Sequence, residues 1–250
     1  MQTVSLLSFI FLEVSVTPVL LQNIPSYVQL CKRNDPKLSE CFINSVNTIR
    51  PYLIKGIPEM DLPQGEPLYY FNATANLDAE QAALVVKVWN QQADGLMNFD
   101  LKSVNIDLDN AKCTFDIFFP NARLQGEYSF QGKLFLFEID TSGYYKLNST
   151  GISANTKFVG RYHTKKGKQH IEFDEVSMKL EVGDAQIYFT NLINGNEQLT
   201  ATVNQAVNEN IHTFINELRP IIEETLAGFV KMYINAVFRL FPVNTLFPSE

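Results

Sequence analysis

The last fifty residues carry an apolar stripe that is very long for a chain of 250 residues. From about Val203 to Leu240, apolar side chains recur every three or four positions, which is the spacing of one helix face. A helix of roughly 40 residues is about 57 Å long at 1.5 Å per residue, so it spans the whole molecule. Pro220 predicts a kink near its middle. The stripe comprises Val207, Ile211, Phe214, Leu218, Ile222, Leu226, Phe229, Tyr233 and Val237.

Between about Tyr69 and Leu192 the apolar pattern changes to a period of two, with turn signals such as Asp94-Gly95 and Lys166-Gly167 between the runs. Successive strands with no intervening helix predict one long antiparallel sheet. The stripe needs an equally long apolar partner, and the sheet is the one available. We therefore expect an α+β fold in which a strongly curved antiparallel sheet wraps round the long C-terminal helix.

The first 22 residues are apolar from Val4 to Leu12 but too short and too interrupted to span a membrane. They fit a secretory signal peptide, which leaves residues 23–250 as one secreted, extracellular domain. Sequons at Asn72 and Asn148 are compatible with glycosylation in such a protein. The alternative is a buried N-terminal strand of an intracellular protein.

Two of the three cysteines, Cys31 and Cys41, flank the start of a short N-terminal helix, for which Asp35 and Pro36 are good N-cap and first-turn residues. In an oxidising compartment the two thiols can pair, and so short a loop stabilises the fold by about 3 kcal/mol. Two unrelated free thiols are the alternative. Cys113 alternates with apolar residues on one strand face, and we expect it to be a buried, inert thiol.

The charge pattern argues against nucleic acid as a partner. The net charge is −7, and the one dense basic group is Lys165, Lys166 and Lys168, which is typical of a solvated hairpin turn.

Catalytic signals are weak. His163, His170 and His212 are the available general bases, and the chain lacks G-x-S-x-G, H-E-x-x-H and phosphate-loop motifs. The first two histidines flank the lysine-rich turn and the third lies on the polar helix face, so we expect surface positions. We predict no catalytic residue, no metal site and no cofactor. A hydrolase of apolar esters remains the weakest alternative.

Several segments, taken in order, resemble the takeout and juvenile hormone-binding protein family of insect secreted carriers. They are the Cys31–Cys41 pair, "GIPE" at 56–59, "GLMNFDLKSVNIDLDN" at 95–110, "GEYSFQGKLFLFEIDTSG" at 126–143, "NLINGNEQLTATVNQAVNEN" at 191–210 and the final "FPVNTLFP". Hormone carriers of the family usually have a second disulfide, which Cys113 alone cannot form. The chain is therefore more similar to the takeout branch.

The resemblance implies a roll like that of lipid-transfer proteins, enclosing a hydrophobic tunnel for a small, elongated terpenoid-like or fatty-acid-like molecule. Within such a tunnel we predict that the hydroxyls of Tyr128 and Tyr145 orient the ligand. Ordinary core packing is the alternative for every residue of the predicted lining. The remaining lining is Trp89, Phe99, Phe115, Ile117, Phe130, Phe137, Phe173, Phe214, Leu218 and Ile222.

The main interpretation is thus a monomeric secreted carrier. An extracellular signalling or adhesion module with a solid interior is the alternative from another class. A shuttle that contacts membranes or a receptor transiently is a variant of the carrier, and it would present an exposed apolar tip near Phe241–Phe247.

Overall fold

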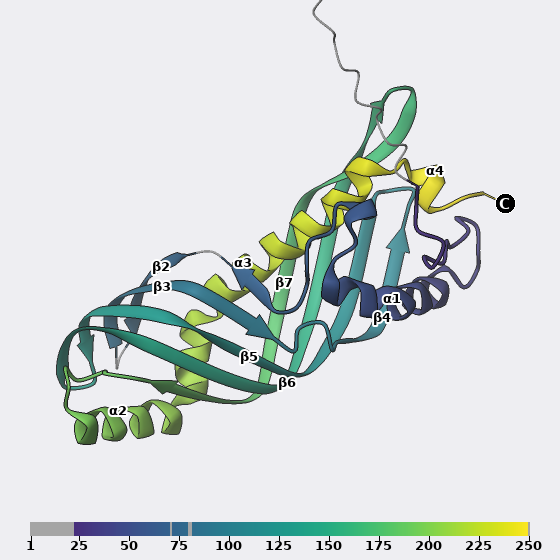
Figure 1. Cartoon of the computed structure of the whole chain (residues 1–250). Coiled ribbons are helices and arrows are strands. Elements are labelled where there is room, and N and C mark those ends of the chain that lie inside the picture. Colours follow the sequence, from purple (N-terminus) through teal and green to yellow (C-terminus); the bar gives the residue numbers. More distant parts are fainter. Residues whose placement is uncertain (1–22, 71, 80–81, 250) are drawn as a thin grey trace, which may run out of the picture.

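The computed structural model describes residues 23–70, 72–79 and 82–249 (Figure 1). The predicted signal peptide, residues 1–22, lies outside the described residues. The helical segments are α1 (Leu38–Lys55), the short 3-10 segment η1 (Pro58–Met60), α2 (Glu197–Glu209), α3 (Ile211–Leu240) and α4 (Val243–Leu246). The strands are β1 (Leu68–Tyr70), β2 (Ala73–Ala79), β3 (Ala82–Asp94), β4 (Asp100–Asp107), β5 (Lys112–Leu134), β6 (Phe137–Lys165) and β7 (Lys168–Phe189).

These strands form one antiparallel sheet in the order β1-β3-β5-β6-β7, with β2 paired to β3 and β4 paired to β5. β5, β6 and β7 are 23, 29 and 22 residues long, so they run the length of the molecule. The sheet curves beside α3 (Figure 1). The predicted α+β fold, a curved antiparallel sheet round a C-terminal helix with a short N-terminal helix, is confirmed. No described helix is long and apolar enough to cross a membrane.

The predicted single helix from about Val203 is wrong in one respect, because the chain breaks at Asn210 into α2 and α3. The Asn210 side-chain amide donates to the carbonyl of Ala206 at 2.8 Å, and its backbone N–H bonds to Val207. Such side-chain bonds compete with regular helix pairing. Pro220 lies inside α3. An apolar stripe does not reveal a one-residue break, because its spacing continues on both sides.

Asparagines of α2 take the place of a further strand along β7, which is an edge of the described sheet. Asn204 accepts from the backbone N–H of Phe189 at 2.9 Å and donates to its carbonyl at 2.8 Å. Asn208 does the same with Ile187, at 2.8 and 2.7 Å. Edge backbone groups left open invite association with other chains, so these bonds also protect the edge.

Two side chains of α3 continue this pairing. Asn235 makes the same paired bonds with the backbone of Phe173, at 2.9 and 3.0 Å. Glu223 accepts from the backbone N–H of Leu180 at 2.8 Å and pairs with the Lys179 ammonium at 2.9 Å. We call Asn204, Asn208, Glu223 and Asn235 the polar seam. It joins both helices to the sheet edge through side-chain-to-backbone bonds.

A row of three residues interrupts the pairing across the middle of the described sheet. Pro120 of β5, Gly151 of β6 and Gly183 of β7 occupy matching positions, and the register resumes on either side of each. Proline has no N–H to donate, and Gly151 has a φ of 63°. The strands change direction between the two halves of the molecule (Figure 1). We call this row the crease.

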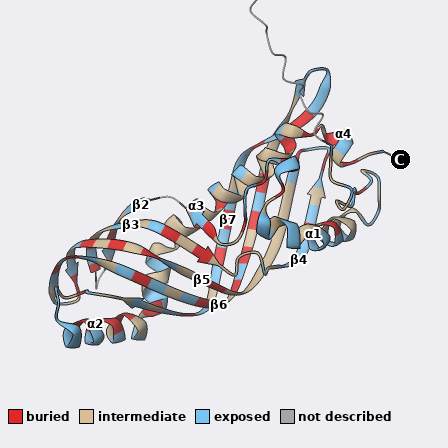
Figure 2. Ribbon diagram, in the orientation of Figure 1, coloured by how far each residue is buried: buried red, intermediate tan, exposed pale blue. Residues whose placement is uncertain are grey.

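The core divides into clusters along the molecule, and burial alternates along the strands (Figure 2). The α2-end cluster contains Tyr128, Phe130 and Val203, the middle cluster contains Met178 and Ala227, and the α1-end cluster is built on rings described below. Phe241 and Phe247 are 3% and 7% exposed. The exposed apolar tip considered for that segment is therefore absent, because both rings are core.

The predicted disulfide between Cys31 and Cys41 is confirmed, with 5.8 Å between the Cα atoms. Sequence reasoning placed the helix start too early. α1 begins at Leu38, and the Asp35 carboxylate accepts from the N–H of Lys37 at 2.8 Å in the turn before it.

Candidate apolar ligand-binding interior

A small apolar pocket of about 20 Å³ lies in the α1-end cluster. Its described lining is apolar apart from Asp107 and the thiol of Cys113. A volume of this size holds roughly one water molecule, so a larger guest requires the side chains to separate. The lining is Phe42, Ile106, Asp107, Leu108, Ala111, Cys113, Phe115, Phe158, Ile171, Phe173, Ile234, Phe238 and Phe247.

The rings round this pocket form a continuous series across five elements and the C-terminal segment. Successive centroids are 5.4, 4.8, 5.8, 5.3 and 6.4 Å apart, which is the range of favourable aromatic pairs. The first four pairs are tilted or edge-to-face, and the last pair, Phe238 and Phe247, is stacked with an interplanar angle of 28°. In order, the rings are Phe42, Phe115, Phe158, Phe173, Phe238 and Phe247.

Three predicted lining residues meet at the opposite end of the molecule, round Phe189. The centroids of Tyr128, Phe130 and Tyr145 lie 5.1, 5.1 and 6.4 Å from that of Phe189. The Tyr128 hydroxyl donates to the carbonyl of Thr190 at 2.6 Å, and burial raises the pKa of Tyr128.

The Tyr145 hydroxyl likewise donates to the side-chain carbonyl of Gln91 at 2.8 Å. The protons that were predicted to orient a ligand are thus engaged within the protein.

The other predicted lining residues are spread over the molecule. Phe137, Phe214 and Leu218 pack against the α2-end cluster. Ile117 and Ile222 pack against the middle cluster.

Trp89 and Phe99 belong to none of these clusters, although the Phe99 ring lies 6.2 Å from that of Phe119, which packs against the middle cluster. Trp89 is half-buried beside a bulge in β3, and Phe99 lies under the Arg50 guanidinium, 4.9 Å from its ring centroid. The predicted set therefore follows the full length of the interior and is not gathered in one site.

Phe115 and Phe173, two residues of the predicted lining, both lie in the wall of the apolar pocket. The prediction did not include Phe42, Phe158 and Phe238, which line the same pocket. The alternation of Phe158 with Tyr162 was a usable signal for one of them. The contact of Phe42 with the sheet was not readable, because it depends on where α1 docks.

Comparison with known proteins agrees with this architecture. The family model for haemolymph juvenile hormone binding protein matches residues 6–248. The chain belongs to this family. Family members are binding proteins, so the apolar interior is the candidate ligand-binding site of this chain. Among proteins of curated function, none matches in sequence.

Two solved structures are similar to this haemolymph juvenile hormone binding protein family member. Takeout 1 of Epiphyas postvittana has a TM-score of 0.74 and 22% identity, over 88% of this chain and 100% of the other. It shows the shared fold. A lipopolysaccharide binding protein has a TM-score of 0.37 and 10% identity, over 77% of this chain and 36% of the other.

One histidine of this family member is not where the sequence placed it. His170 is 4% exposed, with Nδ1 2.9 Å from the carbonyl oxygen of Phe238. The C-terminal end of α3 covers His170. The sequence alone indicated an exposed position, because His170 follows closely after the lysine-rich turn. The described residues contain no group of three or more side chains arranged to hold a metal ion.

Cys113 lies half-buried in the pocket wall and is a free thiol. Burial raises its pKa to about 12, and the charge of Asp107 adds to the effect. The thiol is therefore protonated at neutral pH and behaves as a small apolar group.

Proposed function

We propose that this protein is a secreted, monomeric carrier that binds a small elongated hydrophobic molecule, terpenoid-like or fatty-acid-like, between α3 and the sheet. The observation that carries the proposal is the series of six rings round the apolar pocket, in a chain of a hormone-binding family. A ligand in the pocket contacts Phe115 and Phe173. A longer one extends past Ile117 and Ile222 toward Phe214.

Burial of apolar area supplies the affinity. Removing about 400–500 Å² of ligand surface from water stabilises the complex by roughly 10–12 kcal/mol gross at 25 cal/mol per Å². Lost ligand freedom and the separation of the rings offset part of this. Micromolar to nanomolar binding follows without a charged contact.

Secretion is part of the proposal, with residues 1–22 as the signal peptide. Asn72 and Asn148 are both exposed, which supports glycosylation at either sequon.

The test uses the secreted protein, starting at residue 23, and the neutral fluorescent probe N-phenyl-1-naphthylamine. We expect enhanced fluorescence that farnesol or methyl oleate displaces. Phe158→Ala should weaken probe binding, while Tyr144→Ala, on the exposed face, should not. A protein that never binds the probe, or never releases it to any elongated apolar compound, would support the signalling or adhesion module, in which the rings are simply core.

A further inference from the structure

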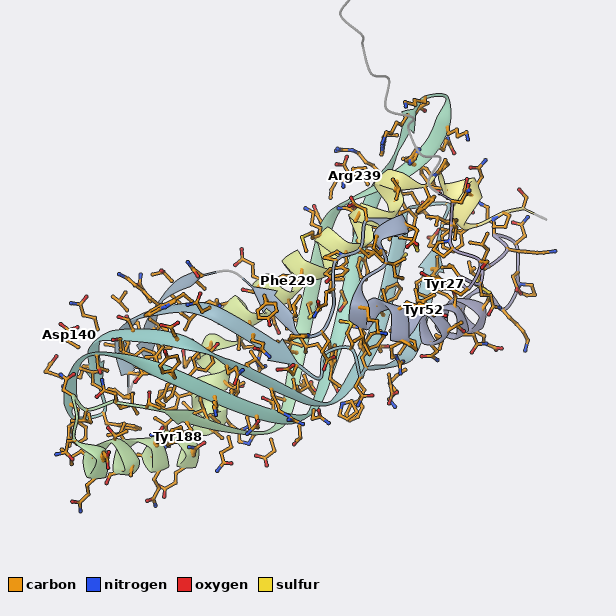
Figure 3. The ribbon with its side chains drawn as sticks, viewed as in Figure 1. Tyr27, Tyr52, Asp140, Tyr188, Phe229 and Arg239 are labelled. Carbon is orange, nitrogen blue, oxygen red and sulfur yellow. A yellow bond between two sulfur atoms is a disulfide. The ribbon has the colours of Figure 1, made fainter. Side chains whose placement is uncertain are left out.

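A groove of about 670 Å³ opens on the surface beside the apolar pocket. Its walls are the segment after η1, with Asp61 and Pro63, the arm formed by β6 and β7, and the C-terminal half of α3. Arg239, labelled in Figure 3, lies where α3 approaches that arm. The volume is within the usual range for small-molecule sites, which is roughly 300–1,000 Å³.

One of the two cations on the groove wall, Lys165, has no carboxylate partner among the described residues, although the wall carries two carboxylates as well, Asp61 and Glu172. The Asp61 carboxylate pairs with Arg239 at 2.8 Å. Arg161, outside the wall, pairs with the Glu172 carboxylate at 2.8 Å and also with Asp174 at 3.3 Å. Lys165 makes no ion pair with any described residue, and its ammonium donates one bond, to the carbonyl of Arg239 at 3.1 Å. The ammonium therefore has further donors to offer.

His163, also in the groove wall, supplies a second unsatisfied group. Its Nδ1 atom is buried and has no hydrogen-bond partner among the described residues. Its ring stacks on that of His170 with centroids 5.7 Å apart. A buried polar atom without a partner costs about 1–3 kcal/mol. If the ring turns so that Nδ1–H points into the groove, a carboxylate that accepts from it would remove this cost.

Ile171 lines both the groove and the apolar pocket. It is 1% exposed, so its side chain fills the partition between the two spaces. The neighbouring part of that partition is held by the paired bonds of Asn235 with Phe173. A chain that reaches from the groove to the pocket therefore has to displace Ile171.

We propose that the groove binds the carboxylate head of a fatty-acid-like amphiphile, held by Lys165 and His163, whose apolar chain passes Ile171 into the ring-lined pocket. This inference rests on the proposed carrier function and adds a preferred ligand class to it. The Lys165 ammonium, which has no carboxylate partner in the described residues, matches the carboxylate of the ligand, and the apolar pocket matches the tail.

The test compares oleate with methyl oleate as competitors of N-phenyl-1-naphthylamine at pH 7.5. In the wild-type protein oleate should displace the probe at about tenfold lower concentration, and 0.5 M NaCl should reduce this preference because the groove is open to solvent. In Lys165→Gln, oleate and methyl oleate should displace the probe at nearly equal concentrations. The control, Lys166→Gln, removes a charge from the adjacent turn outside the groove wall and should keep the tenfold ratio.

Two more variants separate binding from a structural role. His163→Leu should lower the ratio without lowering the melting temperature, because it removes the unsatisfied atom. Ile171→Ala should speed the dissociation of acid and ester alike.

The carboxylate site would be overturned if oleate and methyl oleate displaced the probe equally well from the wild-type protein. It would also be overturned if Lys165→Gln and Lys166→Gln lost the preference for oleate to the same extent. Either result would leave the carrier function intact. Failure of both compounds to displace the probe would overturn the carrier and this site together.

Discussion

At the scale of residues, the reactivity of the Cys113 thiol measures how accessible the ring-lined pocket is. Its pKa is about 12 because the thiol is buried and lies near Asp107, and the thiolate is the reactive form. We predict that iodoacetamide at pH 8.5 alkylates it at least about a hundredfold more slowly than in guanidinium chloride. A bound apolar ligand should slow the reaction further. Equal rates in the native and unfolded protein would show that the pocket is open.

Glu223 and its neighbour Glu224 give a second test at this scale. Glu223 is 7% exposed and holds the N–H of Leu180, whereas Glu224 is exposed. Glu223→Ala should lower the free energy of unfolding at pH 7 by about 1–3 kcal/mol, because a backbone N–H loses its acceptor. Glu224→Ala should change it by less than about 0.5 kcal/mol. Urea unfolding measures both, and equal effects would contradict the structural role of the polar seam.

The same glutamate makes the stability depend on pH. Burial raises its pKa, but the Leu180 N–H and the Lys179 ammonium more than offset this, so its pKa lies below the ordinary 4.5. A lowered folded-state pKa means that the stabilisation is complete above pH 4.5 and is lost as the pH falls through the lowered value. The deficit of Glu223→Ala should therefore decrease on acidification. If Glu223→Ala lowered the free energy of unfolding by the same amount at every pH, the charge of Glu223 would contribute nothing to stability.

At the scale of elements, two glycines should respond in opposite directions. Gly151, in the crease, has a φ of 63°, where a side chain is strained. Gly228 lies within α3, and no described atom lies within 4 Å of the position of its Cβ. Gly151→Ala should destabilise by about 1–2 kcal/mol, whereas Gly228→Ala should stabilise by up to about 1 kcal/mol. Thermal unfolding of the two variants checks the signs, and two shifts of the same sign would contradict this account of the crease.

At the scale of the whole molecule, ligand binding should raise the melting temperature, because a ligand that binds the folded state alone stabilises it by mass action. At a hundredfold excess over Kd the gain is about 2.7 kcal/mol, or about 5–10 °C for a domain of this size. Differential scanning fluorimetry with oleate measures it. No shift at a concentration that displaces the probe would place the probe outside the interior.

Much of the architecture was predictable because it depends on local periodicity. A period of two from Tyr69 to Leu192 specified strands, the spacing of three and four after Val203 specified a helix, and Cys31 and Cys41 were close enough to pair. These patterns record which face of each element is apolar, and an apolar face has to be covered. The α+β class and the disulfide therefore followed from the sequence alone.

The tertiary structure alone decided how these elements close on each other. The sequence does not distinguish Asn204 and Asn208 from other polar residues, yet their side chains bond to the backbone groups at the edge of β7. The rings of Phe42 and Phe115 meet because α1 docks on the sheet, and His170 is buried because α3 covers its strand. Such contacts join residues far apart in the chain, and periodicity contains no information about distance between elements.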